Sequence, residues 1–275
     1  MPSSKINHKT FSTFDVNTVK FNGIRASESG MKFCNFQGPN GDRLVIETPA
    51  MKIPWNTEVR ASRDNGSLSA KLALSFQGMD GPTGVRVTAF REFLDKLDVR
   101  ARQLLTENKG ELWAKNMDEN KVNAVFQDSV KESNNEKYAP TFQMKIGLSD
   151  NPAPESDNPN DVKKMNITVF DVNRKPLSTS ELQGGCMASA IVEASYVWVG
   201  PMMAGITWNV KSVLIKPKEK EEEFQFTETD EFGEAEEETP AKRKRESDDE
   251  GKESFSDDDS SDRDELEDED ETFEG

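Results

Sequence analysis

The sequence is poor in histidine and cysteine, the residues on which much catalytic and metal chemistry depends. In 275 residues there is one histidine, His8, and there are two cysteines, Cys34 and Cys186. A Ser-His-Asp or Cys-His nucleophile and a structural zinc site each need more of these residues than the chain supplies. The cysteines lack CxxC spacing and are interpreted as buried free thiols in a reducing compartment. We therefore expect no catalytic residues, no metal and no cofactor.

Long apolar runs are also missing. No stretch approaches the roughly 20 apolar residues that a membrane-spanning helix needs, and no apolar segment follows Met1. The sequence therefore predicts an intracellular protein that does not bind membranes.

Acidic residues are abundant, and they are unevenly distributed. The formal net charge is −17, yet residues 217–275 hold 28 acidic and 8 basic residues, which leaves 24 acidic and 27 basic residues in 1–216. A mildly basic body thus carries a strongly acidic tail. The tail has too few apolar residues to offset the entropy cost of ordering, about 1–2 kcal/mol per residue, so we expect 217–275 to be disordered.

The body, residues 1–216, shows the period-two alternation of β-strands. One predicted hairpin joins 31–36 to 43–48 through a Gly-Pro-Asn-Gly turn at 38–41, and a second joins 187–199 to 205–215. Further strands are predicted at 71–76, 141–146 and 165–169. The fold class is therefore mainly β, an open or partly closed barrel resembling the oligonucleotide-binding fold.

One long helix is predicted at about 88–106, where apolar residues recur at spacings of three and four before an Asn-Lys-Gly stop signal. Such a helix needs a sheet to cover. Residues 149–161 are rich in proline, aspartate and asparagine and predict a mobile loop between strands.

Basic and aromatic residues on the predicted outer strand faces and loops suggest a surface for single-stranded nucleic acid. Such binders combine a positive groove for phosphates with aromatic faces on which bases stack. The predicted stacking residues are Phe36, Trp55 and Tyr138. The predicted phosphate contacts are Lys32, Arg43, Arg60, Arg63, Lys71, Lys145 and Lys211.

Three other aromatic residues are assigned to the core, because they fall on the apolar side of the alternation along their predicted strands. Trp208 alternates with polar neighbours and is in phase with Ile206 and Val210. Trp198 and Tyr196 are in phase with Val192 in the preceding strand, so the alternation predicts that they too point inward.

The acidic tail contains two kinds of candidate signal. Lys242, Arg243, Lys244 and Arg245 form a basic cluster typical of nuclear import. Ser247, Ser256 and Ser261 each precede an acidic residue by three positions, the pattern of acidophilic kinase sites, and phosphorylation would add negative charge. A tethered polyanion competes with nucleic acid for a basic groove, although a purely solvating tail and a basic counterweight within it remain open alternatives.

Three segments of the body resemble one family. Residues 44–55 read LVIETPAMKIPW, residues 137–145 read KYAPTFQMK, and residues 198–211 end in a Gly-x-Thr-Trp return. They resemble the Thr-Pro/Pro-aromatic segment, the Tyr-x-Pro-Thr strand and the closing hairpin of single-stranded DNA-binding proteins from large nucleocytoplasmic DNA viruses. The layout is also similar to phage replication single-stranded DNA-binding proteins, whose acidic tails end in an aromatic residue; here Phe273 is followed by Glu274 and Gly275.

The resemblance implies an oligonucleotide-binding core that acts on single-stranded DNA in viral genome replication. The resemblance also implies that a DNA-binding surface contains Lys52, Trp55, Tyr138, Lys145 and Lys211.

The leading hypothesis is a non-enzymatic single-stranded DNA-binding protein whose tail limits binding and recruits replication proteins, in the nucleus or a viral replication compartment. A chaperone for histones or other basic proteins and a structural virion protein are the alternatives, followed by an enzyme that holds magnesium through scattered carboxylates. Whether the chain forms a homo-oligomer stays open.

Overall fold

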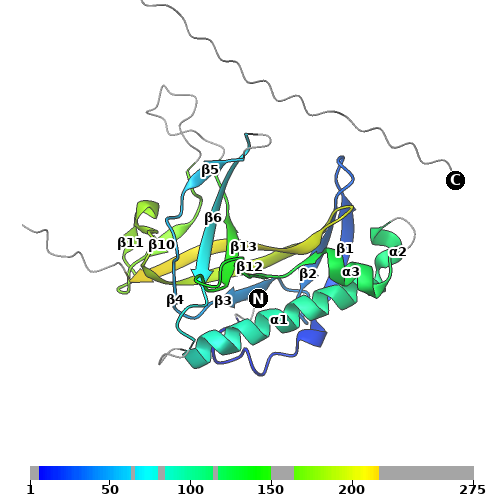
Figure 1. The fold of residues 1–275 in the computed structure, drawn as a ribbon, viewed down its shortest axis with the longest axis horizontal. Coiled ribbons are helices and arrows are strands. Elements are labelled where there is room, and N and C mark those ends of the chain that lie inside the picture. Colours follow the sequence, from blue (N-terminus) through cyan, green and yellow to red (C-terminus); the bar gives the residue numbers. More distant parts are fainter. Residues whose placement is uncertain (1–5, 63–65, 80–83, 114–116, 150–163, 217–275) are drawn as a thin grey trace, which may run out of the picture. The chain divides into compact units, whose positions relative to one another are not determined.

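The computed structural model describes residues 6–62, 66–79, 84–113, 117–149 and 164–216, and these residues form a mainly β fold (Figure 1). The helices are α1 (Gly84–Glu107), α2 (Lys109–Leu112) and α3 (Glu119–Val125), with 3-10 turns η1 (Val16–Thr18) and η2 (Thr179–Glu181). The strands are β1 (Lys20–Ala26), β2 (Lys32–Gln37), β3 (Leu44–Glu47), β4 (Met51–Lys52), β5 (Val59–Ala61), β6 (Leu68–Ser75), β7 (Phe126–Gln127), β8 (Val130–Lys131), β9 (Thr141–Ile146), β10 (Thr168–Phe170), β11 (Pro176–Leu177), β12 (Met187–Val199) and β13 (Ala204–Lys216).

The sheet closes on itself through five of its strands. Its order is β1-β2-β12-β4-β6-β9-β13-β10-β11, and β12 also pairs with β13, so β12, β4, β6, β9 and β13 form a circuit. Two joins in the circuit are narrow, because β4 meets β6 only at Lys52 and Ser75 and β9 meets β13 only at Lys145 and Asn209. The predicted fold class is confirmed: the described residues are mainly β, with a few helices and a partly closed sheet.

The β12–β13 hairpin is the longest element of the sheet, and the sequence predicts it within a few residues. The first predicted hairpin is only partly right. Its turn is closed by an isolated bridge between Gln37 and Arg43, but β2 and β3 both pair with β12 rather than with each other. Pairing with the long strand β12, which is distant in sequence, therefore replaces the pairing of β2 with β3 that the local turn predicts.

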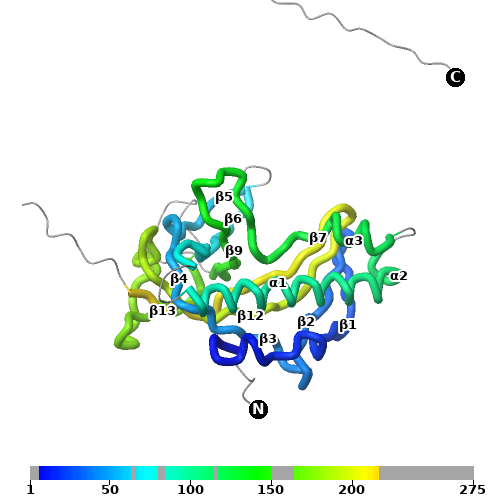
Figure 2. The backbone as a smooth tube through the Cα atoms, turned by 60° about the horizontal axis from the view of Figure 1, so that its bottom comes forward, coloured from blue at the N-terminus to red at the C-terminus, as the bar shows by residue number. Residues whose placement is uncertain are grey.

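Helix α1 runs along the β12–β13 hairpin and covers the barrel core (Figure 2). The structure extends the predicted helix by a few residues at its start, to Gly84. Its apolar positions are buried as the spacing predicts, and Phe90 is fully buried, with its ring centroid 5.3 Å from that of Phe11 and 5.5 Å from that of Phe142. Burial of each such side chain contributes about 1.5–3 kcal/mol, so this face of α1 fastens the helix to the sheet.

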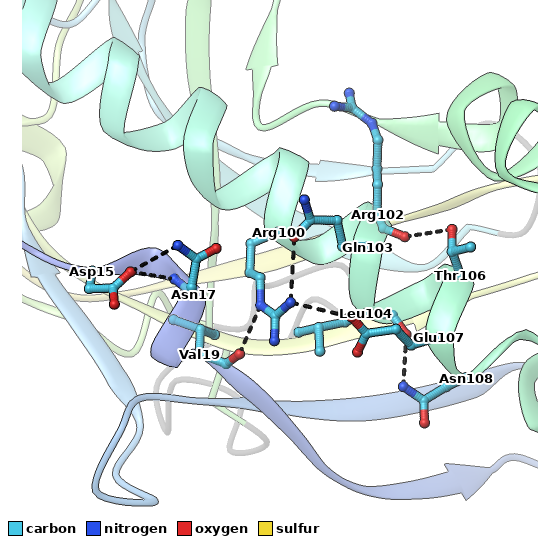
Figure 3. A network of polar contacts seen from close by, with 10 residues as sticks. All are labelled: Asp15, Asn17, Val19, Arg100, Arg102, Gln103, Leu104, Thr106, Glu107 and Asn108. Carbon is cyan, nitrogen blue, oxygen red and sulfur yellow. Dashed lines mark hydrogen bonds and ion pairs between the residues drawn. The ribbon is translucent and has the colours of Figure 1, made fainter.

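Arg100 ties α1 to the segment that precedes β1 (Figure 3). Its Nε donates a hydrogen bond to the Val19 carbonyl at 3.2 Å, and its Nη1 lies 3.5 Å from Oε1 of Glu107. The helix ends at the predicted stop signal, where the Asn108 side chain donates to the Leu104 carbonyl at 2.8 Å.

Several predicted segments lie outside the described residues. These are the loop at 149–161 apart from Ser149, and the tail at 217–275 with its basic cluster and three serines. Of the helices that the structure describes, none is both long and apolar enough to cross a bilayer.

Phe90→Ala tests the joint between helix and barrel. We expect it to lower the free energy of unfolding by about 3–5 kcal/mol, because it leaves a cavity among packed rings. Val85→Ala on the same helix is the control; Val85 is 81% exposed, so its change stays within about 0.5 kcal/mol. Urea denaturation measures both, and equal effects would contradict the described packing.

Candidate nucleic-acid interface

A groove lies on the outer face of β6 and β9. Along β6, Leu72 and Leu74 point into the core, whereas Lys71 points to the other face. Two cavities of about 250 and 300 Å³ open there and share Lys71 and Gln143, so they are adjacent. We call the two together the Trp55–Trp198 groove, defined by Trp55, Arg60, Lys71, Lys131, Gln143, Lys145 and Trp198.

Three lysines converge in this groove. Lys71 and Lys145 are direct cross-strand partners on β6 and β9, an arrangement in which like charges repel and destabilise the sheet. Lys131 enters from β8, and burial together with the charge of Lys71 lowers its pKa, although Asp128 and Asp98 act in the opposite direction. The groove therefore keeps a cluster of positive charge at some cost in stability.

The carboxylates that line the groove form salt bridges with arginines rather than with these lysines. Glu58 lies 3.5 Å from Arg60, and Asp128 forms an ion pair with Arg102 of α1. Among the residues that the structure describes, none of the three lysines forms a salt bridge. An anion entering the groove would thus meet three lysines that form no salt bridge, of which Lys131 feels the charges of Asp128 and Asp98.

Trp55 forms one end of the groove and is held by a rigid loop. The Ile53 N–H donates to the Cys186 carbonyl at 2.8 Å, and the Gly184 N–H donates to the Asn56 side chain at 2.9 Å. A side chain at Gly184 would come within 3.1 Å of the Trp55 Cα, so glycine permits this close approach. Trp55 is 43% exposed and lines the groove, and its predicted stacking on a base stays a prediction.

Trp198 lines the other cavity, and here the predicted phase is wrong. The pairing of β12 with β13 shifts between Ala194 and Tyr196, so the strand carries a β-bulge. After the bulge Val197 and Val199 point inward, while Tyr196 and Trp198 are half-buried. One inserted residue thus moves Trp198 from the predicted core to the groove. Trp208 of β13 is 3% exposed and buried as predicted.

A buried carboxylate lies behind the groove wall. Asp98 of α1 accepts hydrogen bonds from the N–H and Oγ of Ser129, both at 2.7 Å, and Trp208 Nε1 donates to the same Oγ at 2.9 Å. Burial raises the pKa of Asp98 to about 7, against the opposing effect of the bonds from Ser129. This chain of bonds fixes the turn before β8, the strand that carries Lys131, to α1.

Of the sequence-predicted site residues, Trp55, Arg60, Lys71 and Lys145 are brought together in the groove. Phe36 is not available: it is 1% exposed and packs on Phe21, so the prediction that it stacks on a base is wrong. The alternation predicts the two faces of β2 correctly, but the face that holds Phe36 is the buried one.

Arg43 and Lys211 lie outside the groove and share one partner. Both contact Glu193, at 2.8 and 3.0 Å, and Ser195 Oγ donates to it at 3.1 Å. Burial acts to raise the pKa of Glu193, but its bonds from Lys211 and Ser195 and the charge of Arg43 lower it below its usual value. The two cations are thus partly compensated within the protein.

The remaining predicted residues also lie apart from the groove. Lys32 donates to the Glu111 carbonyl of α2, Lys52 is exposed on β4, and Tyr138 is 68% exposed in the segment before β9. Arg63 lies outside the described residues. The roles predicted for Lys32, Lys52, Arg63 and Tyr138 stay predictions.

Lys131, Gln143 and Trp198 were missed as site residues. Residues 126–131 form two short strands, and nothing in their local pattern indicates that Lys131 meets Lys71. Gln143 alternates with buried Phe142 and Met144, a signal for its outward position but not for its function.

Comparisons with known proteins give limited results. No family model and no curated protein matches the sequence. Among solved structures, the chain is similar to the single-stranded DNA-binding protein of bacteriophage Enc34 in complex with single-stranded DNA, with a TM-score of 0.39 and 11% identity over 74% of this chain and 97% of that one. It is also similar to gp2.5, a single-stranded DNA-binding protein encoded by bacteriophage T7, with a TM-score of 0.35 and 13% identity over 67% of this chain and 97% of that one. Because both TM-scores are low, these likenesses assign neither a family nor a ligand to this chain.

Asp98 predicts a specific pH dependence of stability. Its pKa is raised on folding from 3.8 to about 7, so its contribution to stability is full below about pH 4 and is lost as the pH rises through 7. Between pH 8 and pH 6 we expect Asp98 to add about 1.4 kcal/mol to the free energy of unfolding. Asp98→Asn should remove that increment, as measured by urea denaturation at both pH values. An unchanged pH dependence in the variant would contradict the assignment.

Proposed function

We propose that this protein binds single-stranded DNA in the Trp55–Trp198 groove, without enzymatic activity and without reading base sequence. The observation that carries the proposal is the clustering of three lysines without salt-bridge partners between two partly exposed tryptophans. Phosphates need positive charge along a path, and unpaired bases need aromatic faces on which to stack. The two adjacent cavities of the groove offer both.

The arrangement favours a single strand over a duplex. In a duplex each base is paired and stacked on its neighbours, so its faces are not free for an indole. Trp55 and Trp198 lie at the two cavities rather than at one point, so unpaired bases could occupy each while the backbone passes over Lys71 and Lys145.

The biological setting is proposed on the sequence. The three family-like segments support a role in the DNA replication of a large DNA virus, with replication proteins as partners of the tail. The Lys242–Arg245 cluster supports action in a nucleus, and a viral replication compartment is the other setting that we propose.

The acidic tail is proposed to compete with DNA for the groove. With 28 acidic residues tethered to the body, its effective concentration near the lysines is on the order of millimolar. Phosphorylation of Ser247, Ser256 or Ser261 would strengthen this competition by adding charge.

The lysines predict the salt dependence of binding. Lys71→Gln and Lys145→Gln should each weaken binding to oligo-dT and reduce the magnitude of the log–log salt slope by about 0.7, because each removes one phosphate contact. Lys96→Gln is the matched control; Lys96 is exposed on α1, away from the groove. Fluorescence anisotropy at several salt concentrations measures the slopes. Slopes that match the wild type in both groove variants would rule out this path for the phosphates.

The tail predicts a gain of affinity on truncation. Residues 1–216 should bind oligo-dT more tightly than the full chain, on the order of tenfold at low salt, with a gap that shrinks as salt screens the competition. Thermal unfolding of both proteins is the control for folding. Equal or weaker binding by 1–216 would refute competition by the tail.

A further inference from the structure

Gly205 lies beside Trp198 in the groove. The two residues are cross-strand partners in the β12–β13 hairpin, and both line the same cavity. On the other side of β12, Trp198 pairs with Phe33 of β2, whose ring packs edge-on against Tyr196 with a centroid separation of 5.2 Å. Trp198 therefore stands between two strands, and its side toward β13 faces a residue without a side chain.

The backbone at Gly205 does not require glycine. Its φ lies outside the left-handed range that favours this residue, unlike that of Gly185. A glycine inside a strand weakens the strand, because it adds chain entropy and packs no side chain. The reason for glycine here is therefore the space beside it.

That space is occupied by the indole. A Cβ at position 205 would lie 3.3 Å from Trp198 Cζ2, closer than ordinary van der Waals contact, and 3.4 Å from Cε2, at the lower limit of such contact. Both atoms belong to the six-membered ring of the indole, so this ring lies where a side chain of β13 would otherwise stand. The Gln127 carbonyl oxygen of β7 would be 3.2 Å away, which is a second contact that any substitution must meet.

We propose that Gly205 is a positioning residue: because it has no side chain, the Trp198 indole can lie against β13 and present a surface on which an unpaired base stacks. The inference rests on the proposed function and names one seat for a base within the groove. Gly205 acts through Trp198 and contacts no base itself.

The test uses four full-length proteins: the wild type, Gly205→Ala, Trp198→Ala and the double variant. Each is titrated with oligo-dT and with an abasic oligonucleotide of the same length, which keeps the phosphates but has no bases to stack. We expect Gly205→Ala to weaken oligo-dT binding about fivefold, the lower end of a base–aromatic stack, and to leave abasic binding unchanged. In the Trp198→Ala background, adding Gly205→Ala should cause no further loss.

Three results would overturn the inference. They are wild-type binding by Gly205→Ala, an equal loss for both oligonucleotides, and a loss that persists when Trp198 is alanine; the last two would place the effect on Gln127 and β7. Gly147→Ala is the matched control, since Gly147 is exposed after β9 and a Cβ there meets no atom within 4 Å.

Folding of Gly205→Ala is checked by thermal unfolding. If this variant does not fold, the double variant decides the question. It recovers folding where the indole is the obstacle, as proposed, and stays unfolded where the Gln127 carbonyl is, which would overturn the proposal.

A failure of the proposed function looks different. If Trp55→Ala and Trp198→Ala both bind oligo-dT as the wild type does, the groove is not the binding site. If both weaken binding and Gly205→Ala does not, only the role of Gly205 is wrong.

Discussion

The hydrogen-bonded β12–β13 hairpin is the constraint on which the rest of the structure depends. β12 pairs with β2, β3 and β4, and β13 pairs with β7, β9 and β10, so the hairpin joins both ends of the sheet. Its closure sets Lys145 of β9 beside β13 and places Trp198 on the same surface as Lys71. The groove is thus a consequence of closing the barrel, and no single strand contains it.

The electrostatics of the groove follow from how charges are paired elsewhere. The acidic side chains that line the groove form ion pairs with arginines: Glu58 with Arg60, and Asp128 with Arg102. Arg43 and Lys211 are likewise held by Glu193. The lysines of the groove have no such partner, and Lys71 faces Lys145 directly. That arrangement lowers stability, and the proposed phosphate path makes use of it.

The sequence predicts most of the architecture and about half of the groove. Alternation identifies β6, β9 and the long hairpin, and the spacing of α1 gives its buried face, because these signals are local. The position of Trp198 is not predicted, because a bulge near Ser195 reverses the alternation of inward and outward side chains along β12. The bulge is seen only in the pairing of β12 with β13. The position of Lys131 is not predicted, because it depends on the hydrogen bond from Ser129 to Asp98, which is 31 residues away in the sequence. Phe36 shows the same limit, since alternation identifies two faces but not which one is covered.

The central claim is that unpaired bases stack at the two ends of a lysine-lined groove. The four indole N–H signals of the protein test it directly. Two-dimensional NMR of the chain labelled at tryptophan Nε1 follows Trp55, Trp113, Trp198 and Trp208 separately as oligo-dT is added. The account predicts large shifts for Trp55 and Trp198 and little change for Trp113, whose Nε1 donates to the Gly200 carbonyl at 3.2 Å. Binding that leaves the Trp55 and Trp198 signals in place would contradict it.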